Sequence, residues 1–539
     1  MKKRIISLVL IMTMALAITG CTSTPKDGAT NSGSSIAESL TIAIAKDENS
    51  LTPFTYVSST GLIVNRLIYD TLLTTNAENE VVPWMIEDDY QVENDFTTYT
   101  VTLLEGQKFH DGSPLTAEDI KFSFTYPATQ KVSSLKKIAN SIKSIDVIDD
   151  KTAVINLKNP DINFPRSGLA AMRIISKKQY ESQPDASVVN ESIGSGMYKL
   201  AEYKVGEYYK LEAVSDYFKG APNVKNINMP IMKDNTAIQQ GLLSGDLAAA
   251  TSSISVEMLE TYGKDDALAV FANAGYSPMI MNINNGRAPM DNPEFRTALT
   301  YAIDVKGIMS TLYREYATIG TKAVIRPDMD YAQSGLDYDY NVSKANELLD
   351  KAGFDKKSDN GIRLTPDGKP CNFTMLVYAS NNDRIRTAEL ITEQLKAVGI
   401  EMTVKAMEMD TVDAFVWPDF DVSKGRDYDF AMWGWGTSIN PDFLPAMFSS
   451  NPEIGTSNVC GYVNPTFDKL VETDFKAVKT AEDLNAVLKN MQKVISEDPG
   501  LITFGYADSL QVCNTEKYNG WVSGKGLNVI NVYSFLGAQ

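Results

Sequence analysis

Residues 373–404, FTMLVYASNNDRIRTAELITEQLKAVGIEMTV, contain the pattern that decides the fold. The run Phe373 to Tyr378 is rich in β-favouring residues, and residues 383–398 repeat apolar residues at helical spacing. Gly399 ends the predicted helix, and apolar and polar residues then alternate over 400–405 as in a strand. Strand, helix and strand in this order predict a βαβ unit with parallel strands and a right-handed crossover.

A second unit of the same kind occurs earlier in the chain. Strands are predicted at 227–232 and 247–250, with a helix at 236–243 between them. A chain of 539 residues is too long for one ordinary hydrophobic core. The two separated units therefore predict an α/β protein with two lobes.

Residues 429–435, DFAMWGW, are almost entirely apolar, which predicts a strand buried on both faces of a parallel sheet. Ligands of such sheets bind beyond the carboxyl ends of the strands. Trp433, Gly434, Trp435 and Gly436 lie at this end and are candidate ligand contacts. Glycine lets another backbone approach closely, and tryptophan offers a large apolar surface. The alternative is that one of the tryptophans only packs inside the protein.

The amino terminus has the pattern of an export signal. Residues 2–4 are basic and precede an apolar run at 5–18 that is too short to span a bilayer. Residues 16–21, LAITGC, resemble the lipobox of bacterial lipoproteins, which implies cleavage before Cys21 and lipidation of its thiol. The alternative is a plain secretory signal with a chance cysteine. Residues 22–39 are small and polar, which predicts a flexible tether with a reach of roughly 23 Å.

The composition excludes several classes of protein. A net charge of −18 makes nucleic acid an unfavourable partner, because an acidic surface repels phosphates. The single histidine, His110, leaves no basis for a multi-imidazole metal site, and there is no Gly-x-Ser-x-Gly elbow or phosphate-binding loop. We therefore expect no catalytic residues, no bound metal and no cofactor. The sequence leaves open whether Cys371, Cys460 and Cys513 include a disulfide.

Five segments carry a resemblance to a known family. The chain is similar to the solute-binding proteins of ABC importers, specifically the large dipeptide/oligopeptide/nickel-binding family, from Leu40 onward. The similar segments are VVPWMIEDDYQVENDFTTYTVTLLEGQKFHDGSPLTAEDIKFSF (81–124), GSGMYKLAEYKVGEYYKLEAVSDYFKGAPNVKNINM (194–229), FRTALTYAID (295–304), YNVSKANELLDKAGF (340–354) and AELITEQLKAVGIEMTV (388–404).

The resemblance implies a two-lobed, periplasmic-binding-protein-like α/β fold with the ligand cleft between the lobes. It places the first lobe at 40–281 plus 507–539, with an extra subdomain at 79–182, and the second lobe at 282–506. It also implies a lipid-anchored monomer on the outer face of the bacterial cytoplasmic membrane. Its partners would be an oligopeptide ligand and the permease and ATPase subunits of the importer.

The ligand contacts implied by the resemblance follow the ends of strands. In the family's peptide binders, the stretch that resembles residues 433–436 runs beside an extended peptide, and an aspartate just after it pairs with the ligand's ammonium. Here Thr437 and Ser438 come first and the nearest acid is Asp442, so that ammonium contact is in question. Further candidates for the walls of the cleft are Trp417, Tyr276, Tyr56, Ser58 and Ser59.

Three alternatives to a peptide receptor stay open. The same fold could bind an oligosaccharide, with Trp433, Trp435 and Trp417 stacking on sugar rings. Nickel or haem transport is disfavoured because no histidine lies near the cleft stretch. A secreted hydrolase with paired carboxylates is disfavoured because nothing in the sequence sets the separation of such a pair.

Overall fold

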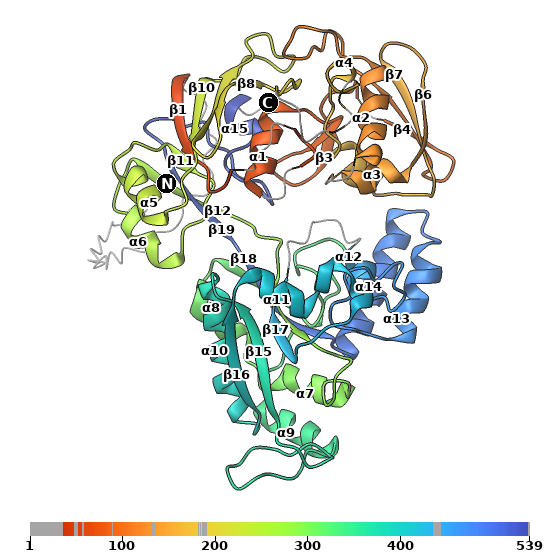
Figure 1. Ribbon diagram of the computed structural model, residues 1–539, viewed down its shortest axis with the longest axis vertical. Coiled ribbons are helices and arrows are strands. Elements are labelled where there is room, and N and C mark those ends of the chain that lie inside the picture. The colour runs from red at the N-terminus through yellow and green to blue at the C-terminus, as the bar shows by residue number, and fades with distance from the viewer. Residues whose placement is uncertain are drawn as a thin grey trace, which may run out of the picture.

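The computed structural model describes residues 36–536, apart from 48–51, 56–58, 89, 131–132, 134, 182, 184, 186–190 and 435–442. The chain forms two lobes, each built on one large sheet with helices packed against it (Figure 1). The predicted two-lobed α/β fold is confirmed. Within the described residues, no helix combines the length and apolar character needed to cross a bilayer.

The first lobe contains a seven-stranded sheet of order β12-β19-β11-β1-β10-β9-β8. Strand β1 is its centre and pairs in parallel with both β10 and β11, while the outer strands are antiparallel. The chain leaves β10, passes through α5 and returns as β11, so the βαβ unit predicted for this region is confirmed. The strands are β1 (Ala37–Ala43), β8 (Tyr198–Lys204), β9 (Tyr208–Ala213), β10 (Val224–Pro230), β11 (Ala249–Ala250), β12 (Leu268–Asn273) and β19 (Ser509–Asn514).

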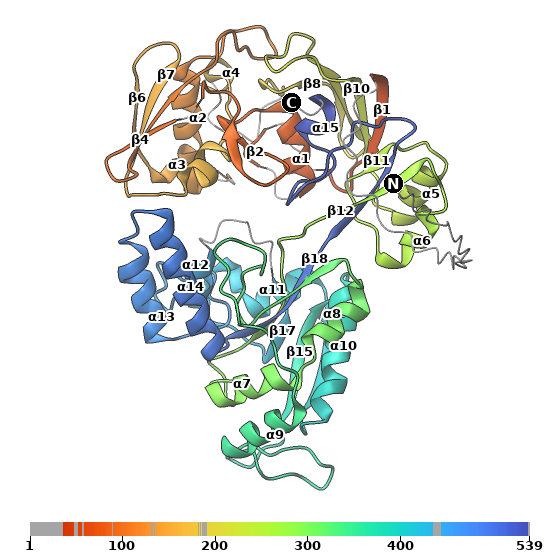
Figure 2. The same ribbon diagram turned by 180° about the vertical axis from the view of Figure 1, so that it is seen from behind.

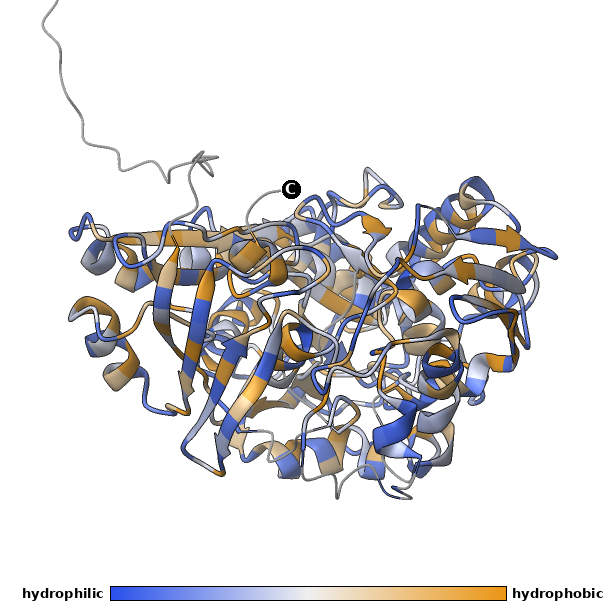
Figure 3. Ribbon diagram, turned by 90° about the horizontal axis from the view of Figure 1, so that it is seen from above, coloured by the Kyte–Doolittle hydropathy of each residue, from blue (hydrophilic) through white to orange (hydrophobic). Residues whose placement is uncertain are grey.

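Helices cover this sheet. The outer strand β9 alternates buried with exposed residues, so that one of its faces packs inside the lobe, whereas β19 is buried along nearly its whole length. Figure 3 shows the alternation as orange and blue bands along the strands. The helices are α1 (Ser59–Ile68), α5 (Asn235–Leu243), α6 (Leu259–Tyr262) and α15 (Val532–Leu536).

A smaller unit, whose elements lie between Leu73 and Tyr180, extends the first lobe. Its sheet is antiparallel, in the order β4-β5-β7-β6, and a separate two-stranded ribbon, β2-β3, lies beside it. Its elements are β2 (Leu73–Thr75), β3 (Val81–Pro83), β4 (Gln91–Glu93), β5 (Thr98–Thr102), α2 (Ala117–Thr129), α3 (Lys136–Ser141), β6 (Ile142–Val147), β7 (Thr152–Leu157), a π-helical turn (Pro165–Leu169) and α4 (Lys177–Tyr180).

The second lobe contains a six-stranded sheet of order β14-β18-β13-β17-β15-β16. Strands β15 and β16 are parallel and are joined by α10, which confirms the βαβ unit at 373–404. The strands are β13 (Met279–Ile283), β14 (Ala317–Ile319), β15 (Asn372–Tyr378), β16 (Glu401–Met407), β17 (Phe430–Met432) and β18 (Leu501–Ala507).

Two layers of helices enclose this sheet, and β17 contributes to the core on both faces. Phe430 and Met432 belong to the cluster under α7, α8, α9 and α10, whereas Ala431 and Trp433 belong to the cluster under α11, α12, α13 and α14. The helices are α7 (Pro293–Ala302), α8 (Val305–Tyr313), α9 (Val342–Lys351), α10 (Asn382–Lys396), α11 (Met409–Val416), α12 (Phe443–Phe448), α13 (Pro465–Lys469) and α14 (Ala481–Glu497).

The predicted strand at 429–435 is longer than the observed one, which ends at Met432. Beyond that residue the main chain bonds to side chains instead of a neighbouring strand. The carbonyl of Trp433 accepts a hydrogen bond from the Asn282 amide at 2.6 Å. The strand is buried on both faces, as its composition predicts.

Two stretches of chain connect the lobes, at 274–278 and at Asp508, and they lie side by side (Figure 2). A Cβ at Gly275 would lie 1.9 Å from the carbonyl oxygen of Ala507, so this close approach requires glycine. The boundary that we expected at 281/282 falls inside β13, which pairs with β17 and β18 of the second lobe. Because β13 belongs to the sheet of the second lobe, the chain passes from the first lobe to the second before Met279.

Candidate ligand-binding site

The end of β17 is held by a buried network. The Trp433 indole is only 4% exposed, and its Nε1–H donates to Asp413 Oδ1 at 2.6 Å. The Tyr378 hydroxyl donates to the same oxygen at 2.7 Å. Because this carboxylate accepts both bonds, it sets the orientation of the indole in the core of the second lobe. The Trp433 side chain therefore packs in the core of the second lobe and offers little surface to a ligand.

Gly434 is the last described residue of this stretch. Its carbonyl accepts a bond from Arg384 Nη2 at 3.1 Å, and the guanidinium lies 5.1 Å from the centre of the Tyr378 ring. A Cβ at Gly434 would stand 3.1 Å from the Ile280 side chain, so a larger residue here would displace that side chain slightly. The carbonyls of residues 433 and 434 are therefore already engaged. Main-chain pairing with a peptide would have to begin after them.

Trp417 continues the aromatic packing from Trp433 toward solvent. The two indoles stand edge to face at 5.9 Å, and the Phe420 ring lies edge to face with Trp417 at 5.3 Å. Phe420 is 66% exposed. Asp419 and Phe420 have φ angles of 50° and 57°, a left-handed conformation that costs energy in residues other than glycine. Phe420 was missed in the sequence, because neither exposure nor backbone angle can be read from it.

A second group of aromatic residues lines a pocket of ≈ 200 Å³ where the linker enters the second lobe. Arg326 is one of the lining residues, and its guanidinium lies 5.2 Å from the centre of the Tyr276 ring and 5.9 Å from that of the Tyr506 ring. Its Nε–H donates to Asp328 at 2.7 Å and its Nη1 donates to the Gly275 carbonyl at 2.5 Å. Of the lining residues, sequence reasoning had found only Tyr276; it missed Arg326, Tyr331 and Phe443, which become neighbours only through folding.

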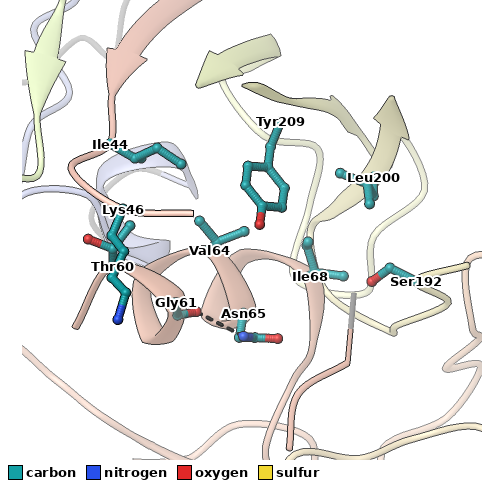
Figure 4. Close-up of a pocket in the computed structure, with 10 residues that line it drawn as sticks. All are labelled: Ile44, Lys46, Thr60, Gly61, Val64, Asn65, Ile68, Ser192, Leu200 and Tyr209. Carbon is teal, nitrogen blue, oxygen red and sulfur yellow. Dashed lines mark hydrogen bonds between the residues drawn. The ribbon is translucent and has the colours of Figure 1, made fainter. Parts of the chain in front are cut away.

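The first lobe has a pocket of ≈ 360 Å³ beside α1, between the end of β1 and the strands β8 and β9 (Figure 4). Lys46, Thr60 and Asn65 contribute polar groups, and Ile44 and Val64 contribute apolar ones. This is the region that follows the first strand, where the resemblance places the first lobe's contacts.

Several predicted contacts lie outside the described residues. They are Trp435, Gly436, Thr437, Ser438, Asp442, Tyr56, Ser58 and the lipidation site Cys21. Ser59 is the first residue of α1, and its side chain is not described. These assignments stay predictions.

His110 has a structural environment. Its Nε2 lies 2.9 Å from the Gly196 carbonyl and its Nδ1 accepts from the Gly194 N–H at 3.2 Å, which together hold the neutral tautomer. Burial lowers the pKa of His110 to about 4. In the part of the chain that the structure describes, no group of three or more His, Cys, Asp or Glu side chains could hold a metal ion.

The three described cysteines, Cys371, Cys460 and Cys513, are free thiols. All three are buried, and burial raises their thiol pKa values. The question that the sequence left open therefore has an answer, since no disulfide joins any two of them.

Contacts between the lobes occur on both sides of the linkers. Lys479 of the second lobe pairs with Asp95 of the extra subdomain at 3.1 Å, and Arg386 pairs with Glu257 at 3.3 Å. Ile162 of the extra subdomain packs against the apolar cluster of the second lobe.

Comparison with known proteins identifies a family with this two-lobed fold. Residues 80–456 match the family model "Bacterial extracellular solute-binding proteins, family 5 Middle", and the chain belongs to this family. The oligopeptide-binding protein AppA of Bacillus subtilis is 27% identical over 85% of this chain and 84% of its own length. The glutathione-binding protein GsiB of Pectobacterium atrosepticum is 25% identical over 90% of this chain and 91% of its own.

Solved structures share the fold. The ABC transporter substrate-binding protein CtaP of Listeria monocytogenes superposes with a TM-score of 0.78 at 23% identity, covering 89% of this chain and 94% of its own. AppA of Bacillus subtilis in complex with a nonapeptide has a TM-score of 0.72 at 24% identity, covering 89% and 95%. The protein is thus a substrate-binding component of an ABC importer, from a family of transport proteins and not of enzymes.

Proposed function

We propose that this protein captures oligopeptides between its two lobes and delivers them to the permease of an ABC importer. The observation that carries the proposal is the similarity along most of the chain to AppA, an oligopeptide-binding protein. Glutathione, the ligand named for GsiB, is itself a small peptide. Two relatives therefore point to the same class of ligand.

The described site has the groups that a peptide receptor needs. Aromatic side chains around Trp417 and in the linker pocket offer apolar surface to ligand side chains of varied shape, with little conformational entropy to lose. Closure of the lobes on the ligand would be a population shift, limited by how much better the closed state binds. We further propose that Trp435, Gly436, Thr437 and Ser438 follow the peptide main chain, and that Asp442 is the acid available to its ammonium.

The proposed location rests on the sequence pattern at the amino terminus. We propose that Cys21 carries the lipid and that residues 22–39 tether a monomeric body to the outer face of the cytoplasmic membrane. Two buried acyl chains hold a protein stably on a membrane, whereas a single chain does so only marginally. A tether of this length keeps the lobes near the permease without embedding them.

An oligosaccharide is the second candidate, because aromatic surface is exposed at Phe420 and beside Trp417. Trp433 is too buried to stack on a sugar. Nickel and haem are poor candidates, because His110 lies in the first lobe and is held by Gly194 and Gly196.

A thermal-shift screen separates these ligands. Peptides should raise the melting temperature, because a ligand at 100 times its Kd stabilises the folded state by about 2.7 kcal/mol. Cello-oligosaccharides should leave the melting temperature unchanged. A shift with sugars but none with peptides would reject the peptide proposal. Native mass spectrometry of the purified protein would independently weigh any ligand that co-purifies, and turnover of that ligand would instead favour a hydrolase.

A further inference from the structure

Arg326 belongs to the body of the second lobe. It lies between β14 and α9, and the two residues before it, Val324 and Ile325, are buried in the apolar cluster under α11, α12, α13 and α14. The arginine itself is 7% exposed. The core of the second lobe therefore sets the place from which this side chain extends.

The guanidinium reaches both of the linkers that join the lobes, the first at 274–278 and the second at Asp508. In the first linker, its Nη1 donates to the Gly275 carbonyl at 2.5 Å, and its centre lies 5.2 Å from that of the Tyr276 ring. It also lies 5.9 Å from the ring centre of Tyr506, just before the second linker. Both ring distances permit cation–π attraction. One side chain of the second lobe thus contacts the chain at both crossings.

An ion pair orients this guanidinium. Its Nε–H donates to Asp328 Oδ1 at 2.7 Å. The N–H groups of arginine lie in one rigid plane, so a bond that fixes Nε also directs Nη1. Asp328 therefore helps to aim the guanidinium at the Gly275 carbonyl.

The second linker is fixed to the second lobe by its own main chain. Strand β18 pairs with β14 as far as Ala507, and the Asp508 N–H donates to the Tyr316 carbonyl at 3.0 Å. Ser509 then begins β19 and pairs with Asn273 of β12 in the first lobe. The second linker therefore passes from one lobe to the other at the bond between residues 508 and 509.

The first linker has no such ladder. In the described part of the chain, pairing with β19 ends at Asn273 and pairing with β18 begins at Met279, so residues 274–278 have no strand partner. The bond from Arg326 fixes this linker to the second lobe at Gly275. With that bond in place, only Ala274 lies between the two anchored parts.

We propose that Arg326 is a positioning residue of the hinge, which holds residues 275–278 as part of the second lobe. The pivot between the lobes is then confined to Ala274 and the bond between residues 508 and 509. A short pivot permits one bending motion, whereas a longer unpaired stretch also lets the lobes twist and slide. With fewer orientations open to the lobes, less conformational entropy is lost when they close on a ligand. The inference goes beyond the proposed function, because it applies to any ligand held between the lobes.

Distances between spin labels on the two lobes test this proposal. The labels are attached to p-acetylphenylalanine in place of Gln240 of α5 and Glu389 of α10, which are exposed positions on helices of the first and second lobe. This chemistry leaves the cysteines unmodified. Double electron–electron resonance on the purified full-length protein without ligand then gives the distribution of distances between the lobes.

Two variants change the arginine. Arg326→Met removes the bond to Gly275 and the ion pair with Asp328 while keeping a long apolar side chain. Arg326→Lys keeps the charge, but an ammonium on a flexible stem does not hold both partners in the fixed geometry of the planar fork. Circular dichroism and melting curves establish that each variant is folded.

Arg296→Met is the matched control. Arg296 is also buried in the second lobe, is ion-paired with Asp498, and donates to the Pro499 carbonyl at 2.9 Å. Pro499 precedes β18, at the opposite end of that strand from Asp508. The control therefore breaks the same kinds of bond and lowers the melting temperature without touching the linkers.

We expect a narrow distance distribution in the wild type and in Arg296→Met. The reach of a flexible segment grows as the square root of its length, so lengthening the pivot from Ala274 to residues 274–278 should widen the distribution roughly twofold in Arg326→Met. Arg326→Lys should lie between the two.

Equal widths in the wild type and Arg326→Met would overturn the proposal. A wider distribution in Arg296→Met would also overturn it, because the loosening would then follow from lost stability alone. If Arg326→Met does not fold, Arg326→Lys is compared with the wild type, and equal widths there lead to the same rejection. The measurement uses no ligand, so a failure of the peptide proposal would leave its result unaffected.

Discussion

Replacement of Trp433 should destabilise the second lobe, because its indole is buried in the lobe's core and hydrogen-bonded to Asp413. Truncating a buried tryptophan to alanine costs about 3–5 kcal/mol. Asp413 keeps the Tyr378 hydroxyl as a donor, so no orphaned carboxylate adds to that cost. For a unit the size of this lobe, each kcal/mol lowers the melting temperature by about 2–4 °C. We therefore expect Trp433→Ala to melt roughly 6–20 °C below the wild type.

Trp435→Ala is the matched variant two residues further on. We expect it to melt close to the wild type without ligand and to weaken peptide binding by about 1–3 kcal/mol, as for an aromatic anchor in an interface. Differential scanning calorimetry and isothermal titration with a bound peptide measure both quantities. A Trp433→Ala protein that melts like the wild type would refute the assignment of Trp433 to the core. Unchanged affinity in Trp435→Ala would remove Trp435 from the ligand site.

Three further predictions concern other parts of the chain. The pKa of His110 is about 4 in the folded protein against an ordinary value of 6.5. The neutral imidazole therefore makes its full contribution to the free energy of unfolding above pH 6.5, and this contribution is lost as the pH falls toward 4. Urea unfolding should show that the free energy of unfolding decreases by about 3 kcal/mol over this pH range because of His110, and this decrease should be absent in His110→Gln. Cys21→Ser should move the protein from the membrane fraction to the soluble fraction, and persistence in the membrane would contradict the lipid anchor. The loss of peptide-binding free energy in Arg384→Met should exceed the loss of folding free energy of the ligand-free protein, because the guanidinium holds the Gly434 carbonyl. Calorimetry and titration together measure the two losses. A loss of folding stability alone would assign Arg384 a structural role.

Exposed ion pairs between the lobes should contribute little. Lys479→Ala, which breaks the pair with Asp95, is expected to change peptide affinity by less than about 1 kcal/mol. Titration at low and high salt measures the effect, and a larger change would mean that this pair controls closure.

Much of the architecture could be predicted from local patterns. The helix α10 has an apolar face at regular spacing and a glycine after its end, and the strands on either side of it are β-rich. Such signals act between neighbours in the chain, so they can be read without knowing the fold. The burial of β17 on both faces could be predicted for the same reason, although its length could not. Its end depends on Asn282, which is distant in sequence and adjacent in the sheet.

The roles of the candidate site residues could not be predicted from local patterns. Sequence reasoning chose Trp433 and Trp417 for their residue type, and the structure places the first in the core and the second between that core and solvent. The apolar stretch around Trp433 predicts a buried strand, but it does not show whether the indole packs inside the lobe or lies at the end of the strand. Its burial comes from α11 and Asp413, some twenty residues earlier in the chain.

By itself, the sequence determined the alternation of strands and helices in the two βαβ units, because it depends on residues close together in the chain. Only the tertiary structure decided which charges are compensated. Arg326 is paired with Asp328, whereas Arg166 donates to the side chain and the carbonyl of Asn79. Asn79 is far from Arg166 in the sequence, and folding alone sets the distance between two such side chains.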